Sequence, residues 1–147
     1  MQRPAPPLEA VRAIGRFEAG GPWIGFGMRG EAWRYVVGTD DAVRDAPADE
    51  DLLLALAIAH FAGAVGEAPP DTEATQSDLS ALVRHLISTQ PDGQRRALLT
   101  EALDAIDDGL AGDAVAGSLA AARSAATDRV DPIDQLLTAA RELTVGG

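Results

Sequence analysis

The two histidines are the first candidates for chemistry, because the chain contains neither cysteine nor lysine. His60 stands in a long apolar segment beside Phe61, and His85 follows Arg84 next to an apolar stripe. One histidine from each of two helices could bind a metal together with a nearby carboxylate. Neither histidine has the Glu-x-x-His or His-x-x-x-His spacing of a metal site. We therefore expect both to be structural, hydrogen-bonded histidines.

Carboxylates gather at three places in the sequence, at 40–41, 49–51 and 104–108. Asp104 and Asp108 are four residues apart, so they face the same way on a helix. They could bind a cation or an arginine of a partner, but they fall on the polar side of that helix. We interpret them as a solvated surface and expect no tightly bound metal and no cofactor.

A Gly-x-Gly-x-x-Gly match at Gly25, Gly27 and Gly30 superficially resembles a dinucleotide-binding loop. The residues that follow include Trp33 and Tyr35 and do not form a clear helical pattern, which the dinucleotide motif requires. We expect these glycines instead to let another part of the backbone come close to a hairpin. The serines lack a nucleophile-elbow context. We therefore identify no catalytic residue.

The charge of the chain limits its partners. It has 147 residues, with 23 acidic and 12 basic side chains and a net charge of -11. This balance opposes non-specific binding to nucleic acid, which depends on basic residues. The longest apolar run, at 52–65, is too short to span a bilayer. The start of the sequence lacks the apolar region of a signal peptide, so we expect a cytoplasmic protein without a membrane span.

In the first half of the chain, apolar residues recur with two different spacings, which predict different elements. Apolar residues three apart predict a short helix over 8–18. Alternating apolar residues on both sides of Arg29-Gly30 predict a β-hairpin over 23–37, with a helical turn at 31–37 as the alternative. Residues 50–65 are apolar nearly all round, which predicts a central buried helix.

The second half is predicted to be helical throughout. After a polar linker at 66–76, Ser77 is expected to cap a helix. Further helices follow near 98–106 and 115–126 and after Asp131-Pro132, with Gly109 ending the first of these. The predicted fold is mainly α, an antiparallel bundle of about five to six helices with one short N-terminal β-hairpin. We expect a single domain over 1–147, with a possible internal boundary at 66–76 between parts at 8–65 and 77–145.

The hairpin is the predicted interaction site. It holds four of the six aromatic residues of the chain, together with two arginines in an otherwise acidic sequence. If helices cover one of its faces, the other face would present aromatic side chains to a partner. The predicted interaction residues are Trp23, Phe26, Arg29, Trp33, Arg34 and Tyr35.

Three functions follow from these features. The first is a non-catalytic protein–protein interaction module, such as an accessory subunit, adaptor or assembly chaperone, which binds another protein or a second copy of itself. The second is a small helical enzyme or ligand-binding protein that uses His60 or His85. The third is an acidic inhibitor that imitates nucleic acid. The third rests on net charge alone, because the acidic residues are spread along the chain.

Overall fold

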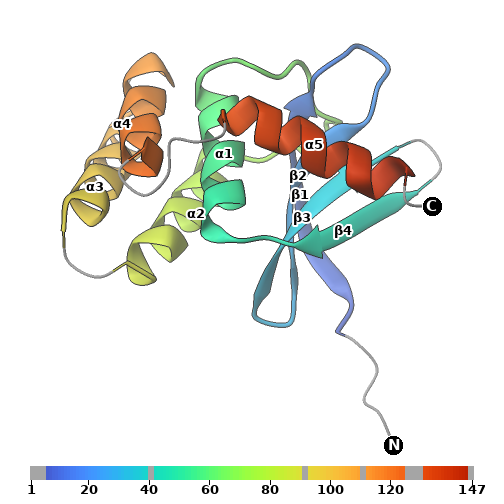
Figure 1. Ribbon diagram of the computed structural model, residues 1–147, viewed down its shortest axis with the longest axis horizontal. Coiled ribbons are helices and arrows are strands. Elements are labelled where there is room, and N and C mark those ends of the chain that lie inside the picture. Colours follow the sequence, from blue (N-terminus) through green and yellow to red (C-terminus); the bar gives the residue numbers. More distant parts are fainter. Residues whose placement is uncertain (1–5, 40–41, 91–92, 110–111, 125–130, 146–147) are drawn as a thin grey trace, which may run out of the picture.

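The residues that the structure describes form four strands followed by five helices (Figure 1). The computed structural model describes residues 6–39, 42–90, 93–109, 112–124 and 131–145. The strands are β1 (Leu8–Arg16), β2 (Trp23–Arg29), β3 (Ala32–Gly38) and β4 (Val43–Pro47). The helices are α1 (Glu50–Phe61), α2 (Gln76–Ser88), α3 (Gln94–Asp107), α4 (Gly112–Ser124) and α5 (Pro132–Val145).

The predicted fold class is wrong, because the N-terminal part is a four-stranded antiparallel sheet rather than one hairpin. Its strands follow chain order, β1-β2-β3-β4. The hairpin itself is present as β2 and β3, which pair from Trp23 with Gly38 to Arg29 with Ala32. Its turn has Gly30 at a φ of 59°, a left-handed conformation that favours glycine. The alternative of a helical turn at 31–37 is therefore also wrong.

The predicted helix over 8–18 is instead strand β1, and its β-bulges explain the error. The register with β2 shifts between Glu9 and Arg12 and again between Ala13 and Gly15. Each bulge adds a residue to the strand, so apolar side chains can recur every three residues without a helix. Leu8 and Ile14 accordingly pack in different apolar clusters rather than along one helical stripe.

The two predicted apolar sets of the hairpin, from β2 and from β3, lie on the same face of the sheet, not on opposite faces. Ile24 pairs with Val37, and Phe26 pairs with Tyr35. Residues directly opposite each other in an antiparallel ladder point to the same face. This face, which we call the inner face, packs against the helices as part of the larger apolar cluster. The expectation of a second, exposed aromatic face is therefore wrong.

The opposite, outer face holds Trp23 and Val36 in a small cluster of its own. Glycines make room for this packing. A Cβ atom at Gly25 would lie 2.0 Å from the carbonyl oxygen of Arg12, and one at Gly38 would lie 2.0 Å from the Trp23 ring. The expected role of glycine in allowing another part of the backbone to come close is confirmed at Gly25, and Gly38 makes room for Trp23 in addition.

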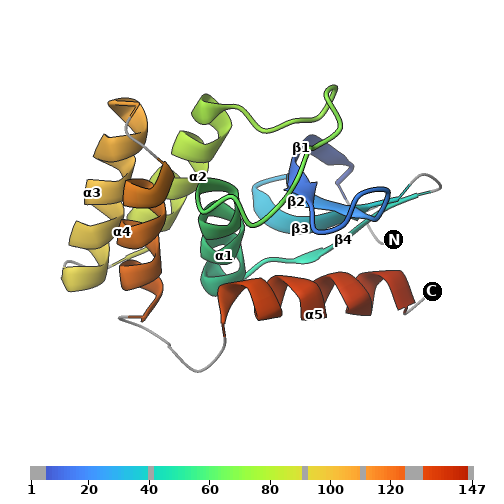
Figure 2. The same cartoon turned by 90° about the horizontal axis from the view of Figure 1, so that it is seen from above.

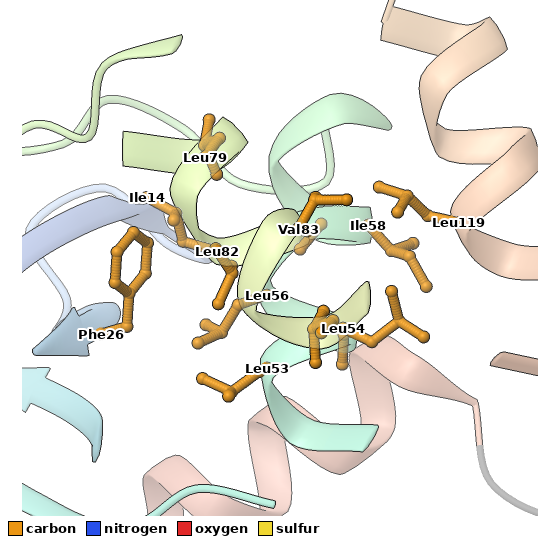
Figure 3. Close-up of a cluster of buried hydrophobic side chains, with 14 of the residues drawn as sticks. Ile14, Phe26, Leu53, Leu54, Leu56, Ile58, Leu79, Leu82, Val83 and Leu119 are labelled. Carbon is orange, nitrogen blue, oxygen red and sulfur yellow. The ribbon is translucent and has the colours of Figure 1, made fainter. Parts of the chain in front are cut away.

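Helix α1 lies at the centre of the molecule, as predicted, although it ends at Phe61 rather than at residue 65. All eight residues from Leu52 to Ala59 are buried. Asp49 begins the helix, because its Oδ1 accepts a hydrogen bond from the backbone nitrogen of Leu52 over 2.8 Å. Figure 3 shows α1 leucines between Phe26 of the sheet and Leu119 of α4.

The remaining helices do not form a single bundle. Helices α3 and α4 pack on each other on the side of α1 away from the sheet, and α5 runs across the sheet (Figures 1 and 2). Helix α2 packs against α1 and α3 and also reaches the sheet, where His85 contacts Trp33. The main contacts of α5 are with α1, β3 and β4. Gly109 follows the C-cap residue of α3 with a φ of 70°, and Asp131 caps α5 through Ile133, as predicted.

The predicted linker at 66–76 packs along the outer edge of β1. The backbone nitrogen of Ala13 donates to Thr72, and that of Ala74 donates back to Ala13, over 2.6 and 2.8 Å. The nitrogen of Gly66 donates to Arg16 over 2.6 Å. This segment therefore covers the β1 edge and connects it to α2.

Candidate functional site

Three of the six predicted interaction residues belong to the core. Tyr35 is 0% exposed, Phe26 is 4% exposed and Trp23 is 7% exposed. The Tyr35 hydroxyl donates a hydrogen bond to the carbonyl oxygen of Leu136 in α5 over 3.0 Å. Burial raises the pKa of this hydroxyl well above its usual value. Phe26 and Tyr35 hold the sheet to the helices, whereas Trp23 packs in the small cluster of the outer face.

The other three predicted residues lie near the end of the hairpin and are half-buried. Arg29 and Arg34 project from the outer face, whereas Trp33 projects from the inner face. We call the surface formed by Arg29, Trp33 and Arg34 the hairpin end. It is the part of the predicted interaction site that solvent reaches.

Arg29 and Arg34 share one carboxylate, that of Asp45 in β4. Arg29 binds it in a bidentate manner, with Nε 2.7 Å from Oδ2 and Nη2 2.8 Å from Oδ1. Arg34 adds a third hydrogen bond from Nε to Oδ2, also over 2.7 Å. The Asp45 side chain is only 9% exposed. Two guanidinium groups around one carboxylate leave a local charge of about +1.

The electrostatics of this cluster keep Asp45 ionised. The hydrogen bonds from Arg29, followed by those from Arg34, lower the pKa of Asp45 to about 2, although burial opposes the shift. Arg29 also donates from Nη1 to the carbonyl oxygen of Pro6 over 2.8 Å. The cluster therefore fixes both arginine side chains and the N-terminal segment against the sheet.

His85 lies on the other face of the hairpin end. Its ring stacks on Trp33, with ring centroids 4.9 Å apart and planes inclined by 24°. Trp33 in turn contacts Phe26, whose ring centroid is 5.8 Å away. The sequence did not indicate this pair, because the two residues lie in different elements, β3 and α2, that are far apart in the chain.

His60 lines a different site, a pocket of about 200 Å³ between α1, α2 and α3. The lining residues are His60, Phe61, Gln76, Leu79, Ile106 and Gly109. Burial lowers the pKa of His60, and the negative charge of Glu73 opposes this shift. The two histidines therefore do not lie in one site. Within the described ranges, no three histidine, aspartate or glutamate side chains are grouped closely enough to bind a metal ion.

Several residues of the acidic clusters have partners within the protein. Glu50 and Asp51, in the first turn of α1, form ion pairs with Arg95 at the start of α3. Asp107 accepts a hydrogen bond from Ser80 over 3.1 Å and forms a longer ion pair with Arg84. These contacts connect neighbouring helices. Asp40 and Asp41 lie outside the described residues.

Strand β4 is a part of the site that the sequence did not predict. Its five residues include charges and a proline and show no clear alternation. It is an edge strand of the sheet, beside β3, and it provides the carboxylate that binds both arginines. Only its pairing register with β3 brings Asp45 near Arg34.

Comparison with known proteins adds no functional assignment. No protein-family model, no curated protein and no solved structure matches this chain. Among the described residues, every helix is either too short or too polar to cross a bilayer.

Proposed function

We propose that this chain is a protein–protein interaction module that works in the cytoplasm as an accessory subunit, adaptor or assembly chaperone, and that it binds its partner at the hairpin end. The observation that carries the proposal is the pair of arginines fixed around Asp45. Side chains already held in one conformation lose little entropy on binding, and arginine is common among the residues that dominate interface energies.

Trp33 extends the proposed surface to the inner face. It is half-buried and stacks on His85, so its ring is held in place while part of it remains accessible. A partner that covers the end of β2 and β3 would contact an aromatic ring on one side and guanidinium groups on the other. This combination is typical of interface anchors.

Crosslinking in the native host tests the proposal. A photo-crosslinking residue replaces Glu31, which is exposed in the turn of the hairpin. We expect one dominant crosslinked partner, whose yield falls about tenfold with Arg34→Gln. Arg84→Gln is the matched control, because Arg84 is an exposed arginine on α2 whose side chain pairs with Asp107 of α3. No crosslink from this position, or equal loss with both variants, would contradict the proposal.

The pocket beside His60 supports a second candidate function, the binding of a small ligand. Pockets for small molecules combine apolar walls with a few polar groups, and this one has His60 and Gln76 among apolar residues. Its volume limits it to a small molecule. A screen of small apolar compounds, followed by His60 chemical shifts, tests this function. We expect binding to the wild type to be lost with His60→Phe, and equal binding to both proteins would contradict it.

A further inference from the structure

The two edges of the sheet differ in how they are covered. Along β1, the segment at 66–74 provides backbone hydrogen bonds to Ala13 and Arg16. For β4, we find no backbone hydrogen bond on the side away from β3 among the residues that the structure describes. An uncovered edge presents a row of backbone donors and acceptors to which another strand can add.

The register with β3 identifies these outward groups. The nitrogen of Thr39 donates to the carbonyl oxygen of Ala42 over 2.8 Å, so this pair is a hydrogen-bonded one. Hydrogen-bonded and non-hydrogen-bonded pairs alternate along an antiparallel ladder. Arg44 and Ala46 therefore bond to β3. Val43 and Asp45 direct both backbone groups outward, and Pro47 directs its carbonyl group outward.

The side chains of β4 leave this edge accessible. Charged residues and proline commonly protect an edge strand. Here the Asp45 carboxylate lies over the sheet on Arg29 and Arg34, so its charge does not block the edge. Pro47 removes one donor at the end of the strand only. Val43, at the other end, is a large apolar residue that is 50% exposed.

Arg34 supplies the charge that selects a partner. Its Nε is 2.7 Å from Asp45, so its guanidinium group already lies near β4. Among the described residues, its two Nη atoms have no hydrogen-bond partner and they reach solvent. A strand added to β4 would lie about 4.8 Å away, with alternate side chains on the outer face beside this group.

We propose that the outer edge of β4 binds an extended segment of a partner protein as a fifth strand, and that a carboxylate side chain of this segment pairs with Arg34. The inference rests on the proposed function and names the partner's chemistry. A second copy fits the edge less well, because its own Asp45 is already bound by two arginines. Two chains that each carry a charge of -11 also repel each other.

A displayed library of random short peptides, selected on the full chain, tests this inference. We expect the selected peptides to carry aspartate or glutamate at alternate positions and to slow hydrogen exchange at the Val43 and Asp45 amides. Val43→Pro removes one outward donor without removing a bond to β3, since proline is tolerated at the first residue of an edge strand. This variant and Arg34→Gln should each weaken binding by about tenfold or more. Arg84→Gln should leave it unchanged.

Each of the following outcomes would overturn the inference. Peptides that bind Val43→Pro as tightly as the wild type do not use the edge, and selected peptides without acidic residues do not use Arg34. A selection that yields no binding peptide also overturns it. Self-association that Val43→Pro abolishes would instead identify a second copy as the occupant. If the crosslink from position 31 is lost with Arg34→Gln but kept with Val43→Pro, strand addition fails and the proposed function stands.

Discussion

At the scale of single residues, two glycines of this chain are expected to respond to alanine in opposite directions. Gly25→Ala places a Cβ atom 2.0 Å from the Arg12 carbonyl oxygen, so β1 must move. We expect a loss of about 3 kcal/mol in the free energy of unfolding. Gly117 lies in α4 with no atom near its Cβ position. There alanine should add about 0.5–1 kcal/mol.

Urea denaturation of both variants measures these changes. Similar destabilisation by the two substitutions would contradict the close packing of β1 on Gly25.

Asp45 is another single residue that is expected to stabilise the fold, and its contribution to the free energy of unfolding depends on pH. Its pKa is about 2 in the folded chain and 3.8 without its partners, so the folded state favours the ionised form. The stabilisation is complete above pH 3.8 and is lost as the pH falls through about 2. Asp45→Asn should cost about 2 kcal/mol at neutral pH.

The measurement is the free energy of unfolding of both proteins from neutral pH downward. The difference between wild type and variant should shrink only as the pH falls from about 4 to about 2. A difference that stays constant over this range would show that Asp45 does not act through its charge.

At the scale of elements, the residue that caps α2 differs from the predicted one. The cap is Thr75, whereas the sequence predicted Ser77. The Thr75 hydroxyl accepts a hydrogen bond from the nitrogen of Asp78, and the Asp78 carboxylate accepts one from the nitrogen of Thr75. Asp78 also forms an ion pair with Arg12 of β1. Thr75→Ala should cost about 1 kcal/mol. Ser77→Ala, one position inside the helix, should change stability by less than about 0.5 kcal/mol.

Thermal unfolding of the two variants provides this comparison. If Ser77→Ala lowers the stability more than Thr75→Ala does, Ser77 caps the helix, as the sequence predicted.

Helices were more predictable from the sequence than strands, for physical reasons. The stripes of α2, α3 and α5 continue over several turns without interruption, so their period is clear. β1 loses its period of two at the bulges, and β4 is short and carries Pro47. The arginines of the hairpin end were recognised because they lie in the aromatic segment of an otherwise acidic sequence. Their partner Asp45 was not, because its position depends on the register of a strand that has no clear pattern.

At the scale of the whole molecule, the larger apolar cluster joins the sheet to all five helices. We therefore expect one cooperative unfolding transition. Tryptophan fluorescence reports on the sheet, because Trp23 and Trp33 are both in strands, whereas far-ultraviolet circular dichroism reports mainly on the helices. The two curves in urea should coincide.

Two separate midpoints in that experiment would contradict a single domain. They would instead place an internal boundary at the segment 66–76, between the sheet with α1 and the helices that follow.

The hydrogen bond from Tyr35 to Leu136 has a consequence for synthesis on the ribosome. Its two residues are 101 positions apart, so the helix that covers the inner face of the sheet emerges long after the sheet. At about 5 to 20 residues per second, the delay is roughly 5 to 20 s. During this time the nascent chain can form its strands but lacks α5. The part of the inner face that α5 covers is then an exposed apolar surface that molecular chaperones can recognise.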